Sequence, residues 1–215
     1  MGWLLAGVGV LVMLANVGSL YALLDYRLGH RLPFQLHLRT SLYGILRAAL
    51  AASGMPWEQG QYEDRGDGVV VIFPPGVAAQ PVVDSFPDRL ICLLRRHNRF
   101  SCEPARMQLR VAVNVGPVYA DGHGFSGDDV VYLCRMLDAQ PLRRALAESG
   151  AELAFIISDY VYEKLVVRRH SLADLSSFRP VRTRVKRTPV HAWIYLPAGA
   201  PHAPARDRSA TARSD

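Results

Sequence analysis

The sequence predicts a single α+β domain in which helices pack on a mostly antiparallel sheet. Half of its 215 residues are apolar and a fifth are charged, which is an ordinary globular composition. Apolar runs with helical spacing alternate with short β-branched runs. Their order is strand, helix, hairpin, helix, strand, two helices, strand, helix and hairpin. This order contains the βαββαβ core of the ferredoxin-like and polymerase-palm folds.

The first element is open to two interpretations, because residues 3–24 carry no charge. Such a run is long enough to cross a bilayer, with Arg27 and Arg31 then on the cytoplasmic side. It also fits a strand buried on both faces. We predict a strand over Leu20–Tyr26. Before it we expect a hydrophobic lead at 2–17, a short helix that contacts the inner face of the cell membrane or packs on a dimer.

The remaining elements follow from periodicity and from turn residues. Glycine and proline residues mark most of the boundaries, and Ser158 is the expected N-cap of the last helix. The predicted helices cover 35–53, a stretch from about 82 or 87 to 97, 127–137, 141–148 and 159–167. The predicted strands cover 69–73, 108–115, 153–157, 178–185 and 190–196. We therefore expect a domain at 18–196, a lead at 1–17 and a disordered tail at 197–215.

Charge and cysteine content argue against several classes of protein. The net charge is +6, but the basic residues are dispersed and have no interleaved aromatic residues, so we expect no nucleic-acid partner. Three cysteines without CxxC spacing favour a reducing, cytoplasmic setting over a disulfide framework or a zinc site. Among 25 basic residues, Lys164 and Lys186 are the only lysines, so chemistry that needs a lysine has two candidates.

A pair of carboxylates is the first candidate site. Asp25 ends the predicted first strand, and Asp67 lies between Gly66 and Gly68 at a hairpin tip. Adjacent strand ends would bring these carboxylates together, where they could bind Mg²⁺ or Mn²⁺. The glycines would let the backbone approach a phosphate. The alternative is that Gly-Asp-Gly only forms a turn.

Two basic side chains are further candidates. Arg135 is a single charge in an apolar helical stretch, so it either extends to solvent or points into a phosphate site. Lys186 lies at the tip of the last hairpin, where it could meet a phosphate or simply be solvated.

Three segments together resemble the catalytic domain of class III nucleotidyl cyclases, the adenylate and guanylate cyclases. They are 63–68 (EDRGDG), 109–118 (LRVAVNVGPV) and 127–136 (GDDVVYLCRM). The resemblance covers residues 18–196. It is closest to small stand-alone bacterial cyclase-like proteins that carry the motif Asp-Arg-Gly-Asp-Gly.

The resemblance implies a role for each candidate residue. Asp25 and Asp67 would bind two Mg²⁺ or Mn²⁺ ions. Arg135 would stabilise the transition state, and Lys186 would contact the triphosphate. Glu63 would select the base, as in guanylate cyclases. The implied reaction converts a purine nucleoside triphosphate to a 3′,5′-cyclic nucleotide and pyrophosphate, in sites shared by a head-to-tail homodimer.

The chain also departs from this family. Val131 replaces the asparagine that contacts the ribose, and losing such a donor costs about 10²–10³ in rate. Gly124 falls at the second base-selecting position and has no side chain. Two hypotheses therefore stay open. The protein is either a weak purine nucleotide cyclase, or a catalytically degenerate cyclase-fold module that binds nucleotide or dimerises as a regulator in signalling.

Overall fold

The computed structural model describes residues 7–16, 31–66, 68–121, 124–168 and 175–197, with 7–16, 31–35 and 121 described by their backbone. Within these residues eight strands form one sheet, in the order β2-β3-β1-β4-β6-β8-β7, and β5 pairs with β4. The β4–β6 pair is parallel and the other pairs are antiparallel. The strands are β1 (Gly7–Asn16), β2 (Gln61–Asp64), β3 (Gly68–Phe73), β4 (Leu109–Asp121), β5 (Gly124–Ser126), β6 (Leu153–Ser158), β7 (Phe178–Val185) and β8 (Thr188–Tyr195).

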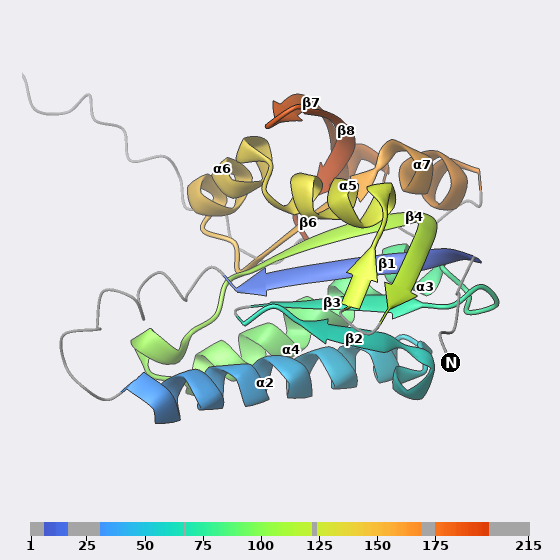
Figure 1. The fold of residues 1–215 in the computed structure, drawn as a ribbon. Coiled ribbons are helices and arrows are strands. Elements are labelled where there is room, and N and C mark those ends of the chain that lie inside the picture. Colours follow the sequence, from blue (N-terminus) through green and yellow to red (C-terminus); the bar gives the residue numbers. More distant parts are fainter. Residues whose placement is uncertain (1–6, 17–30, 67, 122–123, 169–174, 198–215) are drawn as a thin grey trace, which may run out of the picture.

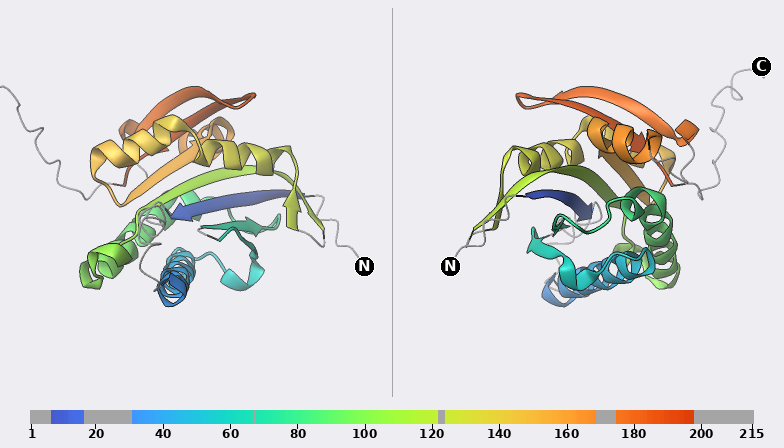
Figure 2. Two further views of the ribbon diagram at one scale, coloured as in Figure 1. Left: turned by 60° about the vertical axis from the view of Figure 1, so that its left-hand side comes forward. Right: turned by 90° about the vertical axis from the view of Figure 1, so that its right-hand side faces the viewer.

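Helices cover both faces of the sheet, so the predicted α+β class is confirmed. Figure 1 shows α2 and α4 on one face and α5 and α6 on the other, and Figure 2 shows β1 between these two layers. Ser158 caps α7 as predicted, because its hydroxyl accepts a hydrogen bond from the Val161 N–H. The helices are α2 (Arg31–Ala52), α3 (Pro81–Asp84), α4 (Phe86–Phe100), α5 (Asp128–Leu137), α6 (Gln140–Ser149) and α7 (Asp159–Val161), which continues as a π-helix over Tyr162–Val167.

The first strand does not begin where the sequence analysis put it. The expected helical lead at 2–17 is wrong for residues 7–16, which form β1 in the middle of the sheet. β1 pairs with β3 over six residues and with β4 over ten. These residues therefore belong to the domain that we expected to begin at residue 18. The strand predicted over Leu20–Tyr26 lies outside the described residues.

The cause of this error is the length of the apolar N-terminal run. A strand with helices on both faces reads as a continuous apolar segment, so periodicity does not say which part of 3–24 enters the sheet. No helix among the residues that the structure describes is long and apolar enough to cross a bilayer. The helix on which the expected membrane contact of 2–17 depended is a strand at 7–16. The tail expected at 197–215 lies beyond the described residues, except for Pro197.

β4 is longer than the sequence indicated. We expected Gly116-Pro117 to end the strand, but β4 continues to Asp121. Figure 1 shows its second half curving in front of the sheet with β5 beside it. Residues 121–127, predicted as a loop, include β5, which pairs with β4 from Tyr119 to Asp121. The glycine and proline therefore bend the strand rather than break it.

Each face of the sheet has its own buried core. On the α2 and α4 face, Leu46, Leu50 and Phe86 are fully buried. On the α5 and α6 face, Leu133 and Leu142 are fully buried. Because alternate residues of β3, β4 and β6 point to opposite cores, these strands are apolar along their buried length.

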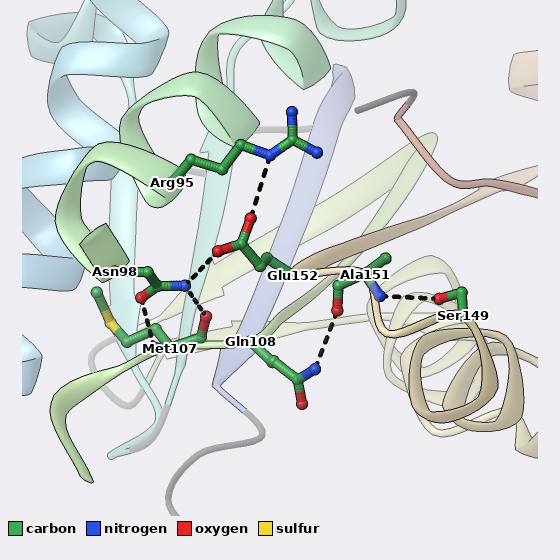
Figure 3. Close-up of polar contacts among 7 residues, drawn as sticks. All are labelled: Arg95, Asn98, Met107, Gln108, Ser149, Ala151 and Glu152. Carbon is green, nitrogen blue, oxygen red and sulfur yellow. Dashed lines mark hydrogen bonds and ion pairs between the residues drawn. The ribbon is translucent and has the colours of Figure 1, made fainter. Parts of the chain in front are cut away.

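A polar network joins α4 to the start of β4 and the turn before β6 (Figure 3). The Asn98 amide donates to the Met107 carbonyl (2.8 Å) and the Glu152 carboxylate (2.9 Å), and its oxygen accepts from the Met107 N–H (2.8 Å). Arg95 pairs with the same carboxylate at 3.1 Å. Since Asn98 is buried, these bonds satisfy backbone groups that water cannot reach.

The central place of β1 gives a test of the fold. We expect a chain that lacks residues 1–16 to lose its cooperative unfolding transition, because β3 and β4 would lose the strand between them. Circular dichroism during urea unfolding measures this. The matched control lacks residues 198–215, which lie in none of the described strands or helices. A truncated chain that starts at Val17 and unfolds like the control would contradict the strand assignment.

Candidate functional site

The β2–β3 hairpin carries the predicted residues Glu63, Gly66 and Gly68. The Arg65 N–H donates to the Gly68 carbonyl at 2.9 Å and closes the hairpin. Gly66 has a φ of +83°, which an L side chain adopts only with strain. Asp67, the predicted metal ligand at the tip, lies outside the described residues.

Asp64 fixes the hairpin to α2. Its carboxylate accepts hydrogen bonds from the Tyr43 hydroxyl (2.7 Å) and the Gly66 N–H (2.9 Å), and it pairs with Arg39 at 2.9 Å. Burial alone would raise the pKa of Asp64, but these three partners together lower it below its ordinary value. Burial and the Asp64 contact raise the pKa of Tyr43 to about 12, so this hydroxyl remains a donor at neutral pH.

Glu63 points to the other side of the hairpin. Its carboxylate accepts the Phe125 N–H of β5 at 2.8 Å and pairs with the Arg65 guanidinium at 2.8 Å. A Cβ on Gly124 would lie 2.7 Å from this carboxylate. The structure thus brings together Glu63 and Gly124, the two positions that the resemblance assigns to base selection.

The end of β1 lies beside the hairpin tip, as expected of a first strand, but it carries no carboxylate there. Ala15 is the register partner of Gly68, and β1 holds no Asp or Glu from Gly7 to Asn16. Asp25 follows β1 by nine residues and lies outside the described residues. No group of three or more acidic, histidine or cysteine side chains among the described residues could hold a metal. The described residues at this end of β1 therefore cannot bind a pair of metal ions by themselves.

Helix α5 carries Arg135 and Val131 on one face, since they are four residues apart. Arg135 is half-buried, and its Nε atom is buried with no hydrogen-bond partner among the described residues. Val131 is 46% exposed, so the side chain at the expected ribose contact is apolar and open to solvent. Burial raises the pKa of the neighbouring Cys134 thiol, which also lies in the field of Arg65 and Glu63. The hairpin and α5 are therefore close together.

Lys186 is exposed in the tight turn between β7 and β8, and its φ of 55° is unusual for a residue other than glycine. The strand directions place this turn far from the hairpin tip. β3 and β4 both begin beside the end of β1, and β6 runs parallel to β4. The antiparallel β8 therefore begins at the opposite end of the sheet.

The distance between these two turns is also large across the sheet. Five strand spacings separate β2 from β8, about 24 Å at the usual ~4.8 Å per strand. One chain therefore does not gather Lys186 and the hairpin glycines around a single phosphate.

A separate hollow of about 570 Å³ opens at the other face of α5. It lies where β4 bends and β6 ends, and Asn114, Asp129, Tyr132 and Asp159 line it. Asn114 donates to Asp129 at 2.9 Å, and Tyr132 donates to the His191 carbonyl at 2.8 Å. None of the predicted site residues lines this hollow.

Sequence reasoning did not single out Arg65 or the Phe125 N–H, although both contact Glu63. The alternation of side chains along an extended hairpin could have placed Arg65 with Glu63, because residues two apart share a face. The Phe125 contact had no local signal, because it depends on how β4 curves across the sheet.

Comparisons with known proteins agree on the fold. The chain is similar to the guanylyl cyclase Cya2, with a TM-score of 0.59 and 16% identity over 91% of this chain and 94% of that chain. It is also similar to a non-canonical dimeric guanylyl cyclase domain of the RhoGC fusion protein from Blastocladiella emersonii, with a TM-score of 0.56 and 16% identity over 88% of this chain and 96% of that chain. A third similar structure is the guanylate cyclase domain of RhGC from Catenaria anguillulae in complex with GTP. Its TM-score is 0.57 and its sequence identity is 14%, over 89% of this chain and 97% of that chain.

These similarities show that the chain has a class III nucleotidyl cyclase-like fold. No family model matches the sequence, and no curated protein matches it. At such low sequence identity the comparisons show the fold alone, so the roles of individual residues remain predictions.

The Asp64 contacts predict a pH-dependent stability. Because folding lowers the pKa of Asp64, its contacts stabilise the protein above pH ~4 and are lost as the pH falls through the lower, folded-state value. We expect Asp64→Asn to reduce the free energy of unfolding by about 1 kcal/mol at pH 7. The loss of unfolding free energy in Asp64→Asn should become smaller as the pH falls from 7 toward 2. Urea unfolding at several pH values in this range measures it.

Asp138→Asn is the matched control, because Asp138 forms an exposed ion pair with Arg143. We expect it to change the free energy of unfolding by less than about 0.5 kcal/mol at pH 7. Equal losses in the two variants at pH 7, or an Asp64→Asn loss that does not change with pH, would contradict the assignment.

Proposed function

We propose that this protein is a homodimeric, purine-nucleotide-binding module of cyclase fold that acts as a regulator in signalling, with weak or no cyclase activity. The observation that carries the proposal is the register of Ala15 against Gly68. A cyclase that uses two metal ions needs two carboxylates near one phosphate. At the strand end beside the hairpin tip, this chain supplies Ala15 and Asn16, neither of which is a carboxylate.

The exposed side chain of Val131 supports the same conclusion. An asparagine there would offer an amide to the ribose, whereas valine has neither a hydrogen-bond donor nor an acceptor. Loss of such a preorganised donor commonly reduces a rate by about 10²–10³. The protein could therefore retain nucleotide affinity while losing most of its turnover.

Nucleotide binding is favoured by the basic groups of the chain. Arg135 is half-buried, and its Nε has no hydrogen-bond partner among the described residues. A phosphate oxygen is the partner that best matches its planar donors. Arg135 would therefore bind a phosphate group of the nucleotide.

A head-to-tail homodimer is favoured by the separation of the predicted residues. The hairpin glycines and Lys186 lie at opposite ends of the sheet, so a second copy in the reverse direction would place one chain's Lys186 near the other chain's hairpin. The similar domain from Blastocladiella emersonii is a non-canonical dimer, so it supports self-association but not this arrangement, and the domain from Catenaria anguillulae was solved with GTP. Each site would then use both chains.

A second candidate function is weak cyclisation of a purine nucleoside triphosphate. The retained Arg135 and Lys186 favour it. In this reaction the ribose 3′-oxygen would lose its proton and bond to the α-phosphorus, while the bond from that phosphorus to the β-phosphate bridging oxygen breaks and pyrophosphate leaves. It would require two Mg²⁺ or Mn²⁺ ions bound by Asp25 and Asp67.

Nucleotide binding and product formation separate these two functions. We expect purified protein to bind fluorescent GTP or ATP analogues in the presence of Mn²⁺, and mass spectrometry to find little or no cyclic nucleotide. Arg135→Ala should weaken binding about tenfold or more, because a charge-assisted hydrogen bond is lost. Arg143→Ala, which removes an exposed arginine paired with Asp138, is the matched control and should bind normally.

Two results would overturn this assignment. Absence of binding of either nucleotide would exclude the nucleotide-binding module. Formation of cyclic product that disappears in both Arg135→Ala and Asp67→Ala would instead establish the second candidate function.

A further inference from the structure

The hollow behind α5 lies where two neighbouring parallel strands part. β4 and β6 pair up to Val113 and Ile157, after which β4 bends and β6 ends. The helices that follow pack on opposite faces, since Leu133 of α5 lies in the core beside α6 and Val161 of α7 lies in the core beside α2 and α4. Such a divergence opens a crevice at the ends of the strands, and ligands commonly bind in crevices of this kind.

Two buried polar side chains line this crevice. Asn114 and Ser158 directly follow the last β4–β6 pair, and each is only 3% exposed. The Asn114 amide donates to Asp129 at 2.9 Å, but its oxygen accepts no hydrogen bond from the residues that the structure describes. The Ser158 hydroxyl accepts the Val161 N–H, which leaves it a second lone pair. Since buried polar groups are nearly always hydrogen-bonded, these oxygens favour a ligand that donates.

Two carboxylates make the hollow acidic, although the protein has a net charge of +6. Asp129 lines it from α5 and Asp159 from α7, and no lysine or arginine within the described ranges lines it. Neither carboxylate forms an ion pair with another described residue. Lys164 contacts the ring of Tyr160 at 5.9 Å instead. A cavity that is lined by charges of one sign attracts ligands of the opposite sign.

Tyr132 forms an aromatic wall beside these carboxylates. β6 ends at Ser158, opposite Ala192, so it does not reach His191. The Tyr132 hydroxyl takes its place, donating to the His191 carbonyl at 2.8 Å and accepting the His191 N–H at 3.1 Å. Burial raises the pKa of Tyr132, the His191 contact lowers it in part, and the nearby charge of Asp159 raises it further. The ring is thus held in place, and an aromatic face attracts organic cations.

We propose that this hollow binds a small organic dication, a molecule with two ammonium or guanidinium groups. Its volume of about 570 Å³ lies in the range of small-molecule pockets. The two carboxylates and the Asn114 oxygen would accept the N–H donors of the ligand. A metal ion fits less well, because no group of three acidic, histidine or cysteine side chains in the described part of the chain could hold one. The site is separate from the proposed nucleotide site, since none of the predicted site residues lines it.

The test titrates putrescine and agmatine into the intact protein by isothermal titration calorimetry. Putrescine carries two ammonium groups, and agmatine carries one ammonium and one guanidinium group. We expect at least one of them to bind with a dissociation constant of about 1 mM or lower, as two or three charge-assisted hydrogen bonds provide. Butylamine, which has one charge, should bind about tenfold or more weakly. Butanediol, an uncharged molecule of the same length as putrescine, should show no binding.

Carboxamide variants test the two carboxylates. Asp129→Asn and Asp159→Asn should each weaken binding of the dication about tenfold or more, because each removes a charge that pairs with the ligand. The Asp129→Asn side chain can still accept the Asn114 amide, so we expect this variant to fold. Asp128→Asn is the matched control, because Asp128 is the exposed neighbour on α5 and does not line the hollow. It removes the same charge and should change the affinity less than about twofold.

Several results would overturn this inference. They are absence of binding of both dications at millimolar concentration, equal binding of butanediol and putrescine, and equal affinity in the Asp129→Asn, Asp159→Asn and Asp128→Asn variants. Displacement of the dication by equimolar Mg²⁺ or Ca²⁺ would identify a metal-ion site instead. The comparison of putrescine with butylamine and butanediol uses the unmodified protein, so it decides the question even where a variant fails to fold. None of these results bears on nucleotide binding, which is measured separately.

Discussion

The pairing of β1 with β3 and β4 is the constraint on which the rest of the structure depends. It joins the hairpin side of the sheet to the side formed by β4, β6, β8 and β7. It also decides which residue lies beside the hairpin tip, because the register sets Ala15 opposite Gly68. A shift of one residue would move every side chain of β1 to the opposite face of the sheet, and pairing with β3 on one edge and β4 on the other holds the register.

The curvature of β4 determines the other half of the candidate site. Because the strand bends instead of ending at Gly116-Pro117, β5 reaches the hairpin and its Phe125 N–H holds the Glu63 carboxylate. This contact orients Glu63 and its partner Arg65 beside α5. Residues from two distant parts of the sequence thus form one polar cluster, and none of them lines the hollow behind α5.

The sequence predicted most of this fold because periodicity and turn residues are local signals. The Ser158 cap of α7, the hairpin at Gly66 and the buried strand β6 follow from short stretches of chain. The position of β1 does not, since an apolar run of 22 residues can supply a strand at more than one place. Likewise, the resemblance pairs Glu63 with Gly124, whereas the contact of Arg65 with Glu63 is evident only in the structure.

Amide hydrogen exchange of the intact protein, followed by mass spectrometry of peptides, tests most directly that residues 7–16 are the central strand. We expect these amides to exchange as slowly as those of β4 between Val111 and Val113, with which they are paired. Exchange of 7–16 within seconds, while β4 stays protected, would contradict the account. Another segment of the chain could then pair with β3 beside Gly68, and it could bring a carboxylate to that position.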